Sequence, residues 1–409
     1  MARREKYLAG LDVGTSRISV IVGEPVPDDD RIDIVGIGLE DSDGIRAGAI
    51  VKMDAAVESI KKAIEEAELT AGVEIDSVYL GLSGAHVKAF NSRGVVAVAG
   101  SNREITKEDV GRAIAAAKAV ALPSGREIVH VLPQDFVVDE QDGIGAPVGM
   151  TGARLEVNVH VVTGSMSTTQ NVVNCVNRAG VKVVDTVLEQ LGAAEAVLTP
   201  DEKELGVALV DIGGGTTKFS IFEKGSLWHT GAIALGGDNI THELAVALRT
   251  PIPEAEKTKR RSGCAMSALV GEEETVEVAS VGGREPRKML KTTLSHCIQP
   301  LAENIFHTLW DEINKAGYEK SLNSGIVLTG GACMLDGIPE IAEQIFGTPV
   351  RRGHPVGLGR LHDHVNTPAF ATSVGLVMYA CRHQVVKRNR FPVLDQVYGW
   401  LTSLFRESA

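Results

Sequence analysis

A chain of 409 residues is longer than one hydrophobic core usually supports, so we expect at least two packed units. Hydrophobic residues make up 44% and charged residues 23%, proportions that exclude a largely disordered protein. The formal net charge of −12 argues against broad nucleic-acid binding, because a cationic surface is needed to displace counterions from phosphates. The 5 cysteines show no C-x-x-C spacing, which indicates no zinc cage or disulfide framework and suits a reducing cytoplasm.

The N-terminal part of the chain shows an alternation of strands and helices. The stretch AGLDVGTSRISVIVG, residues 9–23, predicts two strands around a glycine turn. A second pair of strands around 32–39, a helix over 54–69 and a buried strand over 77–84 are expected next. This alternation continues along the chain, so the predicted fold class is α/β.

The pattern of expected strands and helices changes over residues 85–162, which predicts a small inserted α/β subdomain. We expect a strand over 94–99 and two long strands, REIVHVLPQDFVVD and RLEVNVHVVTG. A capping box formed by Thr106 and Asp109 predicts a helix over 107–121.

The second half of the sequence repeats the strand and glycine-turn pattern of the first half. After the helix TTQNVVNCVNRAG, which ends on Gly180, and the strand VKVVDTVL, the stretch ALVDIGGGTTKFSIF predicts two strands around a second glycine turn. The elements expected after it are the strand LWHTGAIALGG, the helix ITHELAVALR, the strand EETVEVASV, a long helix over 286–315, a third glycine turn GIVLTGGACMLDG and the helix AFATSVGLVMYACRH.

The first two turns share a pattern that suits phosphate binding. Asp-x-Gly-Thr-Ser at 12–16 and Asp-x-Gly-Gly-Gly-Thr-Thr at 211–217 each place an aspartate at a strand end before glycines and hydroxyl residues. Glycines let backbone N–H groups approach a phosphate, and hydroxyls add donors. Asp12 and Asp211 would face Mg²⁺ or its water ligands, because this cation prefers carboxylate oxygens and keeps much of its hydration shell. Two surface hairpins whose glycines only fit positive φ are the simpler alternative for either turn alone.

The two matching turns resemble those of the actin, Hsp70 and sugar-kinase ATPase superfamily, as do the stretches TGGACMLDG and AEKTKRRSG. That resemblance implies an actin-like (RNase H-like) fold of two lobes that clamp Mg-ATP between their first hairpins. The residues that it assigns to nucleotide binding are Asp12, Gly14, Thr15, Ser16 and Arg17 in the first turn, Asp211, Gly213, Gly214, Gly215, Thr216 and Thr217 in the second, Gly236, Gly237 and Asp238 in a further phosphate-side turn, Glu256 and Lys259 at the ribose and purine, and Gly330, Gly331 and Ala332 around the adenosine.

Within the superfamily, the sequences at 126–164 and 81–96 and the C-terminal tail closely resemble the FtsA family of bacterial cell-division proteins. That resemblance implies an FtsA-type inserted subdomain in the first lobe and a protein that polymerises on ATP and anchors the FtsZ ring to the inner membrane. It also implies the C-terminal tail of FtsZ, further copies of the chain and other divisome proteins as partners, the last through the inserted subdomain. The expected location is the cytoplasmic side of the inner membrane at the division site, as a peripheral protein.

The resemblance also suggests how the chain divides. The expected parts are residues 1–84 and 163–195 as the first core subdomain, 85–162 as the insert, 196–226 and 303–381 as the second core subdomain with its last helix returning toward the first, 227–302 as a further subdomain of the second lobe, 382–392 as a basic linker and 393–409 as a terminal helix.

The tail offers independent support for membrane attachment. At 100° per residue, its apolar and polar residues separate onto two sides of a helix. A basic connector precedes it, and Tyr398 and Trp400 favour the headgroup region. We therefore expect a helix lying in the membrane plane rather than one packed on the protein body. The expected lipid contacts, preferably with anionic lipids, are Lys387, Arg388, Arg390, Val393, Leu394, Val397, Tyr398, Trp400, Leu401, Leu404 and Phe405.

One position departs from the family pattern. FtsA relatives commonly carry an arginine after the proline of the long second-lobe helix, where FtsZ docks, and this chain has Leu301 there. Arg284, Arg287 and Asn304 are the remaining candidates for that contact. Leu301 is equally consistent with an ordinary core residue.

Three other functions of the superfamily are alternatives. A chaperone of the Hsp70 type would need a substrate-binding region, and only 74 residues follow Leu335. A sugar or acid kinase would need a base for a substrate hydroxyl, and the sequence singles out none. A pilus-assembly actin homologue is a third alternative, against which the amphipathic tail argues. Binding residues do not specify a water-activating group, so at most weak ATPase activity is expected.

Overall fold

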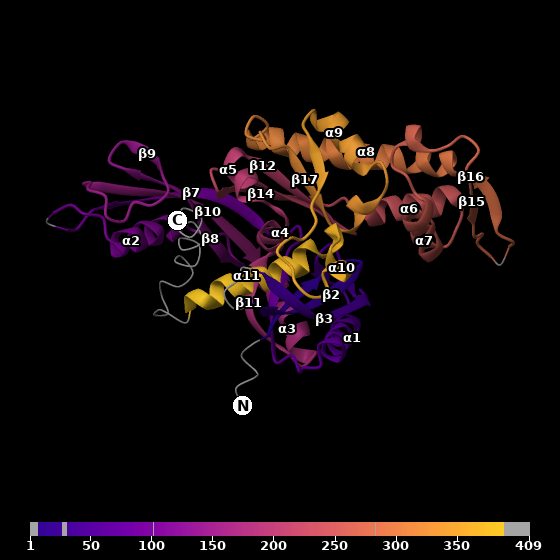
Figure 1. Ribbon diagram of the computed structural model, residues 1–409, viewed down its shortest axis with the longest axis horizontal. Helices are drawn as coiled ribbons and strands as arrows, with labels where there is room; N and C mark the ends of the chain where they lie inside the picture. Colours follow the sequence, from indigo (N-terminus) through magenta and orange to yellow (C-terminus); the bar gives the residue numbers. More distant parts are fainter. Residues whose placement is uncertain (1–6, 27–30, 101, 283, 388–409) are drawn as a thin grey trace.

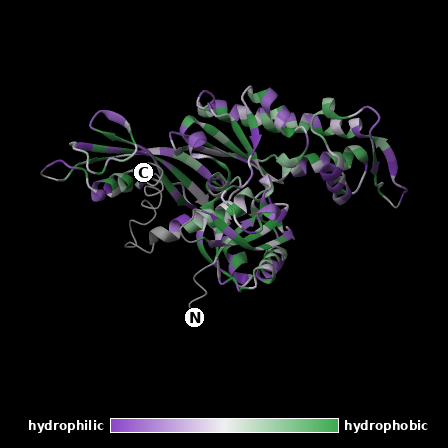
Figure 2. Cartoon of the chain, in the orientation of Figure 1, coloured by the Kyte–Doolittle hydropathy of each residue, from purple (hydrophilic) through white to green (hydrophobic). Residues whose placement is uncertain are grey.

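The computed structural model describes residues 7–26, 31–100, 102–282 and 284–387, with side chains to residue 383 (Figure 1). Three main sheets organise this part of the chain: one in each of two lobes and one in the inserted subdomain, which extends to one side of the molecule. Hydrophobic residues follow the strands of both lobes, and hydrophilic residues gather on the peripheral loops (Figure 2). The predicted α/β class is confirmed.

The sheets of the two lobes have the same plan. In the first lobe a central strand pairs antiparallel with the strand that follows it and parallel with a later one, and the second lobe repeats this arrangement. The order in the first sheet is β11 (Lys182–Leu188), β6 (Ser77–Leu82), β1 (Leu8–Val13), β2 (Arg17–Pro25) and β3 (Ile32–Asp41). The matching order in the second is β18 (Val350–Arg352), β17 (Ile326–Thr329), β12 (Val207–Ile212), β13 (Thr217–Glu223) and β14 (Ser226–Ile233).

Helices cover both sheets and close three separate cores. The cores are apolar because the strands are nearly continuous runs of branched residues, buried on both faces. The first-lobe helices are α1 (Met53–Ala71), α3 (Met166–Arg178), α4 (Glu189–Val197) and α11 (Ala371–Lys387), and those of the second are α5 (Pro200–Leu205), α6 (Gly237–Leu248), α7 (Ile252–Ser262), α8 (Lys291–Ala316), α9 (Ile338–Phe346) and α10 (His362–Val365). Helix α11 is the last helix of the described residues, and it packs against α4 and the first sheet.

The inserted subdomain has its own core beneath a four-stranded sheet. Its strands follow the order β7 (Lys88–Ala97), β10 (Arg154–Ser165), β8 (Arg126–Val138) and β9 (Gln141–Ile144), and α2 (Lys107–Lys118) packs on one face. The predicted capping box is confirmed, because the Thr106 hydroxyl accepts from the Asp109 amide and the Asp109 carboxylate accepts from the Thr106 amide. The predicted strand at 94–99 is longer and begins at Lys88.

Several predicted elements differ from the structure. Residues 32–41 form the single strand β3, and only the short strands β4 (Ile45–Arg46) and β5 (Ala49–Ile50) follow it. The long helix begins at Lys291 rather than at 286, because β16 (Arg287–Leu290) pairs antiparallel with β15 (Thr275–Val278). Helix α7 was not predicted, since its sequence carries almost no apolar stripe and buries only three residues. Helix α11 continues to Lys387, so the first part of the expected linker is helical.

Candidate nucleotide-binding site

The two predicted phosphate turns have the same backbone geometry. In the first hairpin the Gly14 amide donates to the Arg17 carbonyl at 3.1 Å, and in the second the Gly213 amide donates to the Thr216 carbonyl at 3.0 Å. The flanking strands close on equivalent pairs, Val13 with Ile18 and Ile212 with Thr217. Both turns are therefore matching parts of duplicated lobes, as the sequence predicted.

The tips of the two hairpins, one from each lobe, face each other at the junction between the lobes. The Ser16 hydroxyl donates to Asp238 Oδ1 at 3.1 Å, which joins the first hairpin to the start of α6. A Cβ atom on Gly214 would collide with the Ser16 hydroxyl, and one on Gly215 would lie 3.0 Å from the Thr15 side chain. Glycine is required here because the opposing hairpin comes this close.

The floor between the hairpins holds a buried charge cluster. Asp12 is the next-to-last residue of β1, Asp211 lies at the equivalent position of β12, and Glu189 begins α4. Lys218 of β13 reaches two of them: its Nζ lies 2.6 Å from Glu189 Oε2 and 3.0 Å from Asp211 Oδ2. Because Glu189 belongs to the first lobe and Lys218 to the second, this ion pair links the lobes at the base of the cleft.

The pKa values in this cluster are shifted by burial and by the neighbouring charges. Burial, then the neighbouring Glu189, raises the pKa of Asp12 to about 8, and Asp211 adds to the rise against Lys218 and Arg17. For Lys218, burial lowers the pKa, but Asp211, Glu189 and Asp12 outweigh it and raise the pKa above its ordinary value. The cluster therefore keeps its lysine charged and favours a further cation.

Arg17 anchors the first hairpin to the start of α11. Its guanidinium donates to the Ala369 carbonyl at 2.8 Å and lies 4.6 Å from the centroid of the Phe370 ring. Burial lowers the pKa of Arg17, and the charge of Asp12 opposes that shift. The Arg17 side chain thus has a structural contact in addition to its predicted place beside the phosphates.

The further phosphate-side turn supports the second hairpin from behind. The amides of Gly237 and Asp238 donate to the carbonyls of Gly213 and Gly214 at 2.9 and 2.8 Å. A Cβ on Gly236 would strike the same two carbonyls. The start of α6 is therefore fixed to the second turn, which holds its glycines in place.

The residues predicted for the adenosine also gather beside α6. Lys259 Nζ donates to the Gly237 carbonyl at 2.9 Å and to Thr241 Oγ1 at 2.7 Å, and it pairs with Glu256 at 2.6 Å. A Cβ on Gly237 would lie 3.2 Å from the Ala332 methyl group, which brings the third glycine turn to the same place. Gly330 has φ of +85° and lies against the Asp211 carboxylate, whereas no atom lies within 4 Å of the position that a Gly331 Cβ would occupy.

A magnesium ion fits this site as a partner of a nucleotide rather than alone. Within the described ranges, no group of three His, Cys, Asp or Glu residues is close enough to hold a metal. The three carboxylates nevertheless outnumber Lys218, and Glu189 and Asp211 add to the burial that raises the pKa of Asp12, a shift that a bound cation would oppose. Asp12 and Asp211 would hold the ion, with phosphate and water oxygens completing its ligands, and the ion would offset the phosphate charge.

The predicted partner residues do not form one patch. Arg284 is exposed, and Arg287 of β16 donates to the Leu248 carbonyl. Asn304 is exposed on α8, thirteen residues beyond its start and so ~20 Å along the helix axis. Leu301 packs against the second-lobe core, which agrees with the structural alternative for that position.

The predicted membrane contacts lie almost entirely outside the described residues. The structure describes only the backbone of Lys387 among them. Every helix within the described ranges is too short or too polar to cross a bilayer.

Sequence analysis missed Glu189 and Lys218. Lys218 directly follows Thr217 in the second turn motif, and Glu189 directly follows the strand VKVVDTVL, but neither position carried a recognised pattern. A signal was present in hindsight, because a lysine within an otherwise apolar buried strand needs a carboxylate partner.

Known proteins match this chain in both sequence and fold. The family model "Cell division protein FtsA" matches residues 208–375, and the model "SHS2 domain inserted in FTSA" matches residues 84–163. Cell division protein FtsA of Pseudomonas aeruginosa is 45% identical over 98% of this chain and 98% of its own length.

Solved structures give the same fold at lower identity. A PilM-PilN type IV pilus biogenesis complex has a TM-score of 0.65 and 16% identity over 91% of this chain and 97% of the matched chain. MreB5 of Spiroplasma citri bound to ADP has a TM-score of 0.54 and 13% identity, covering 94% and 98%. These likenesses confirm the actin-like fold, and the sequence match over nearly the whole length shows that the chain belongs to the FtsA family of cell division proteins.

Proposed function

We propose that this chain binds Mg-ATP in the cleft between its two hairpins, polymerises on the cytoplasmic face of the bacterial inner membrane and attaches the FtsZ ring to it. The observation that carries the proposal is the pair of facing glycine hairpins, joined by Ser16 and Asp238, in a chain of the FtsA family. A structural neighbour was solved with ADP, which supports nucleotide binding by this fold.

In the proposed complex each part of the site has a separate task. The amides and hydroxyls of the two hairpin turns bind phosphate oxygens, while Asp12 and Asp211 hold the magnesium ion. Lys259 and Glu256 contact the ribose and purine, and the third glycine turn lies along the adenosine. Because ligands of both lobes meet one nucleotide, its binding favours the closed arrangement and thereby an interface for the next copy of the chain.

Hydrolysis of ATP is expected to be weak at most. Glu189 is the further carboxylate at the floor of the cleft, and its Oε2 is held by Lys218 at 2.6 Å. A carboxylate in such an ion pair is a poor proton acceptor for a water molecule. Formation of a phosphorylated sugar together with ADP would instead favour the superfamily phosphotransferase.

Membrane attachment is proposed for residues 393–409, with Lys387, Arg388 and Arg390 attracted to anionic lipid. One short amphipathic helix binds weakly, but a filament presents many of them, so each later contact becomes effectively intramolecular. The FtsZ tail is proposed to dock on the second lobe through Arg284, Arg287 or Asn304, and other divisome proteins on the inserted subdomain. A pilus-assembly scaffold would need neither lipid nor FtsZ.

A sedimentation assay tests the membrane and polymer parts of this proposal. The full chain and a chain ending at Phe391 are mixed with ATP, Mg²⁺ and vesicles containing anionic lipid. We expect only the full chain to sediment with the vesicles and to form filaments on them. Equal sedimentation of the two chains would exclude the tail from membrane binding.

A matched pair of variants tests the orientation of the tail helix. Leu401→Glu places a charge on the apolar side, whereas Thr402→Glu places the same charge on the polar side. We expect the first to abolish sedimentation and the second to preserve most of it, because only a buried charge loses its hydration. Similar losses from both would contradict an in-plane helix.

A further inference from the structure

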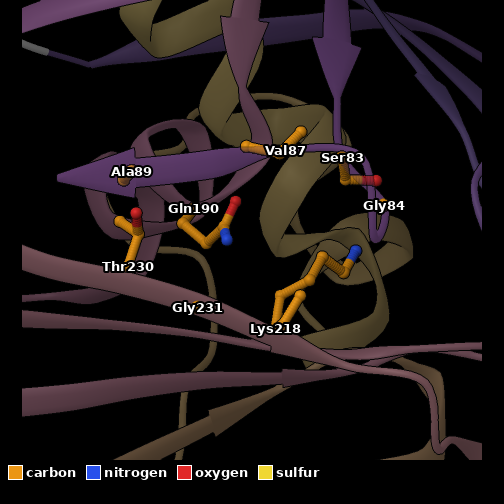
Figure 3. Close-up of a pocket in the computed structure, with 9 residues that line it drawn as sticks. Ser83, Gly84, Val87, Ala89, Gln190, Lys218, Thr230 and Gly231 are labelled. Atoms are coloured by element: carbon orange, nitrogen blue, oxygen red, sulfur yellow. The ribbon is translucent and has the colours of Figure 1, made fainter. Parts of the chain in front are cut away.

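Lys218 is a buried cation placed where the lobes meet. It is the second residue of β13, 7% exposed, and its side chain lies beside the loop of Ser83 and Gly84, as Figure 3 shows. Its ammonium pairs with Asp211 of its own lobe and with Glu189 of the other. A lysine loses much of its hydration at such a depth, so an uncompensated one would be strongly destabilising.

The first hairpin has no counterpart of this lysine. Asp211 is opposite Lys218 in the β12–β13 register, and Asp12 is opposite Ser19 in the β1–β2 register. The Ser19 hydroxyl donates to the Ser373 hydroxyl at 3.1 Å and carries no charge. Lys218 is therefore a feature of this chain's second hairpin, not a requirement of the hairpin architecture.

Charge balance gives this lysine a role in ligand binding. Asp12, Asp211 and Glu189 carry three negative charges when ionised, and Lys218 supplies one positive charge to the same group. A phosphate chain entering between the hairpins adds negative charge, which the floor must offset. A divalent cation bound to Asp12 and Asp211 is one source of the positive charge that offsets the phosphates. Lys218 is a second source, and as part of the chain it cannot dissociate.

The surroundings of Lys218 hold it in this place. With Gln190 and Thr230 it lines a small, partly open pocket that also includes Gly84. The Oε1 atom of Gln190 is buried there and has no hydrogen-bond partner within the described part of the chain. The two carboxylates thus hold the ammonium, and the pocket lies beside the Lys218 side chain.

We propose that Lys218 is a built-in counter-ion of the nucleotide site, which supplies part of the positive charge that Mg²⁺ provides and allows the cleft to close on an adenine nucleotide in the absence of a divalent cation. This inference rests on the nucleotide binding proposed above and adds to it a reduced dependence on metal. The ligand class is a nucleoside diphosphate or triphosphate.

Calorimetric titration of the full chain with ADP, in Mg²⁺ and in EDTA, tests the inference. The quantity compared is the ratio of Kd in EDTA to Kd in Mg²⁺. We expect a ratio below ~10 for the wild type and a ratio at least fivefold larger for Lys218→Met, because the variant depends on the metal alone. Lys320→Met, an exposed lysine of the same lobe, should keep the wild-type ratio.

A second variant covers the case in which Lys218→Met does not fold. Lys218→Met combined with Glu189→Gln removes both charges of the pair that links the lobes, so that of the two carboxylates only Asp211 loses its ammonium partner. We expect it to fold and to show the same enlarged ratio. Lys218→Arg retains the positive charge and should restore a ratio near that of the wild type.

The outcomes separate this inference from the proposed function. Wild-type binding in Mg²⁺ with none in EDTA would overturn the role of Lys218 and leave nucleotide binding intact. The role of Lys218 would also be overturned if the ratio of Kd in EDTA to Kd in Mg²⁺ rose less than fivefold in Lys218→Met. If Lys218→Met does not fold, the same limit applies to the double variant. No binding under either condition would overturn the proposed function itself.

Discussion

The two phosphate hairpins share a backbone and differ in chemistry. Both close through one amide-to-carbonyl hydrogen bond across the turn, and both carry an aspartate at the same position of the preceding strand. Opposite that aspartate, however, the first hairpin has Ser19 and the second has Lys218. The second hairpin is also tied to α6, through Gly213 and Gly214. The duplicated fold therefore repeats the turn in both lobes, while single side chains decide how each hairpin balances charge.

Filling the space between the hairpins should have the largest effect. Gly214→Val would place branched carbon atoms where the Ser16 hydroxyl and the Asp238 carboxylate now lie. We expect a loss of ADP affinity of about 100-fold, near the upper range for overpacking. Isothermal titration calorimetry measures it.

The matched control for this substitution lies in the same turn. A Cβ on Gly213 would approach the Thr216 carbonyl at 3.1 Å and no atom of the first hairpin. Gly213→Ala should therefore bind ADP nearly as well as the wild type. Equal losses from both variants would mean that turn flexibility, not contact with the facing hairpin, governs binding.

Substituting the paired aspartates should reveal the charge asymmetry directly. Asp211→Asn removes one of the two carboxylates that hold the buried Lys218, and we expect the free energy of unfolding to fall by about 2–3 kcal/mol. Asp12 forms no ion pair within the described ranges, and burial, then Glu189, raises its pKa to about 8, so Asp12→Asn should raise the free energy of unfolding at neutral pH. Denaturant unfolding without nucleotide, monitored by circular dichroism, compares them. Equal effects would contradict the asymmetry.

Acidification should act on the second lobe through the inserted subdomain. His160 joins the insert to the second sheet, because its ring nitrogens lie 2.7 Å from Asn91 Oδ1 and 3.0 Å from Thr230 Oγ1 of β14. Burial, then the charge of His229, lowers the pKa of His160 to about 3. The unfolded chain therefore binds more protons than the folded chain between pH 6.5 and 3, and stability falls as the pH falls through this window.

The size of that loss can be measured against a variant that does not titrate. Between pH 7 and 5 the wild type should lose about 2 kcal/mol through His160 alone. His160→Gln, which keeps hydrogen-bonding groups without a titrating ring, should lose that much less over the same range. Parallel pH profiles for the two proteins would show that His160 does not couple acidity to stability.

The hairpins were predictable because their signal is local and repeated. An aspartate, glycines and hydroxyl residues within seven positions define a turn without reference to the rest of the chain, and the second copy confirms the first. The capping box at Thr106 and Asp109 is equally local. Helix α7 was missed because a helix with few buried residues leaves no hydrophobic periodicity to detect.

The charge cluster could not be predicted for a different reason. Glu189 and Lys218 are 29 residues apart and belong to different lobes, so their contact depends on how the lobes meet. The same holds for Ser16 and Asp238, which are separated by 222 residues. Sequence patterns identify the parts of each hairpin, whereas tertiary packing decides which side chains face one another across the cleft.

The Ser16 contact with Asp238 should give the smallest effect and the finest test of the comparison. Ser16 is exposed, so water competes for its hydrogen bond and the net contribution is about 1 kcal/mol or less. Ser16→Ala should therefore leave the fold intact and raise the dissociation rate of ADP by about threefold, as measured by stopped-flow displacement of a fluorescent analogue. Thr15→Ser, which keeps a hydroxyl beside Gly215, should dissociate at the wild-type rate. The Ser16 hydrogen bond joins the first hairpin to α6, the helix that supports the second hairpin. Faster release of ADP from Ser16→Ala, but not from Thr15→Ser, would therefore show that this bond holds the lobes together in addition to Lys218 at the base of the cleft. Unchanged release would assign that task to the Lys218 and Glu189 pair.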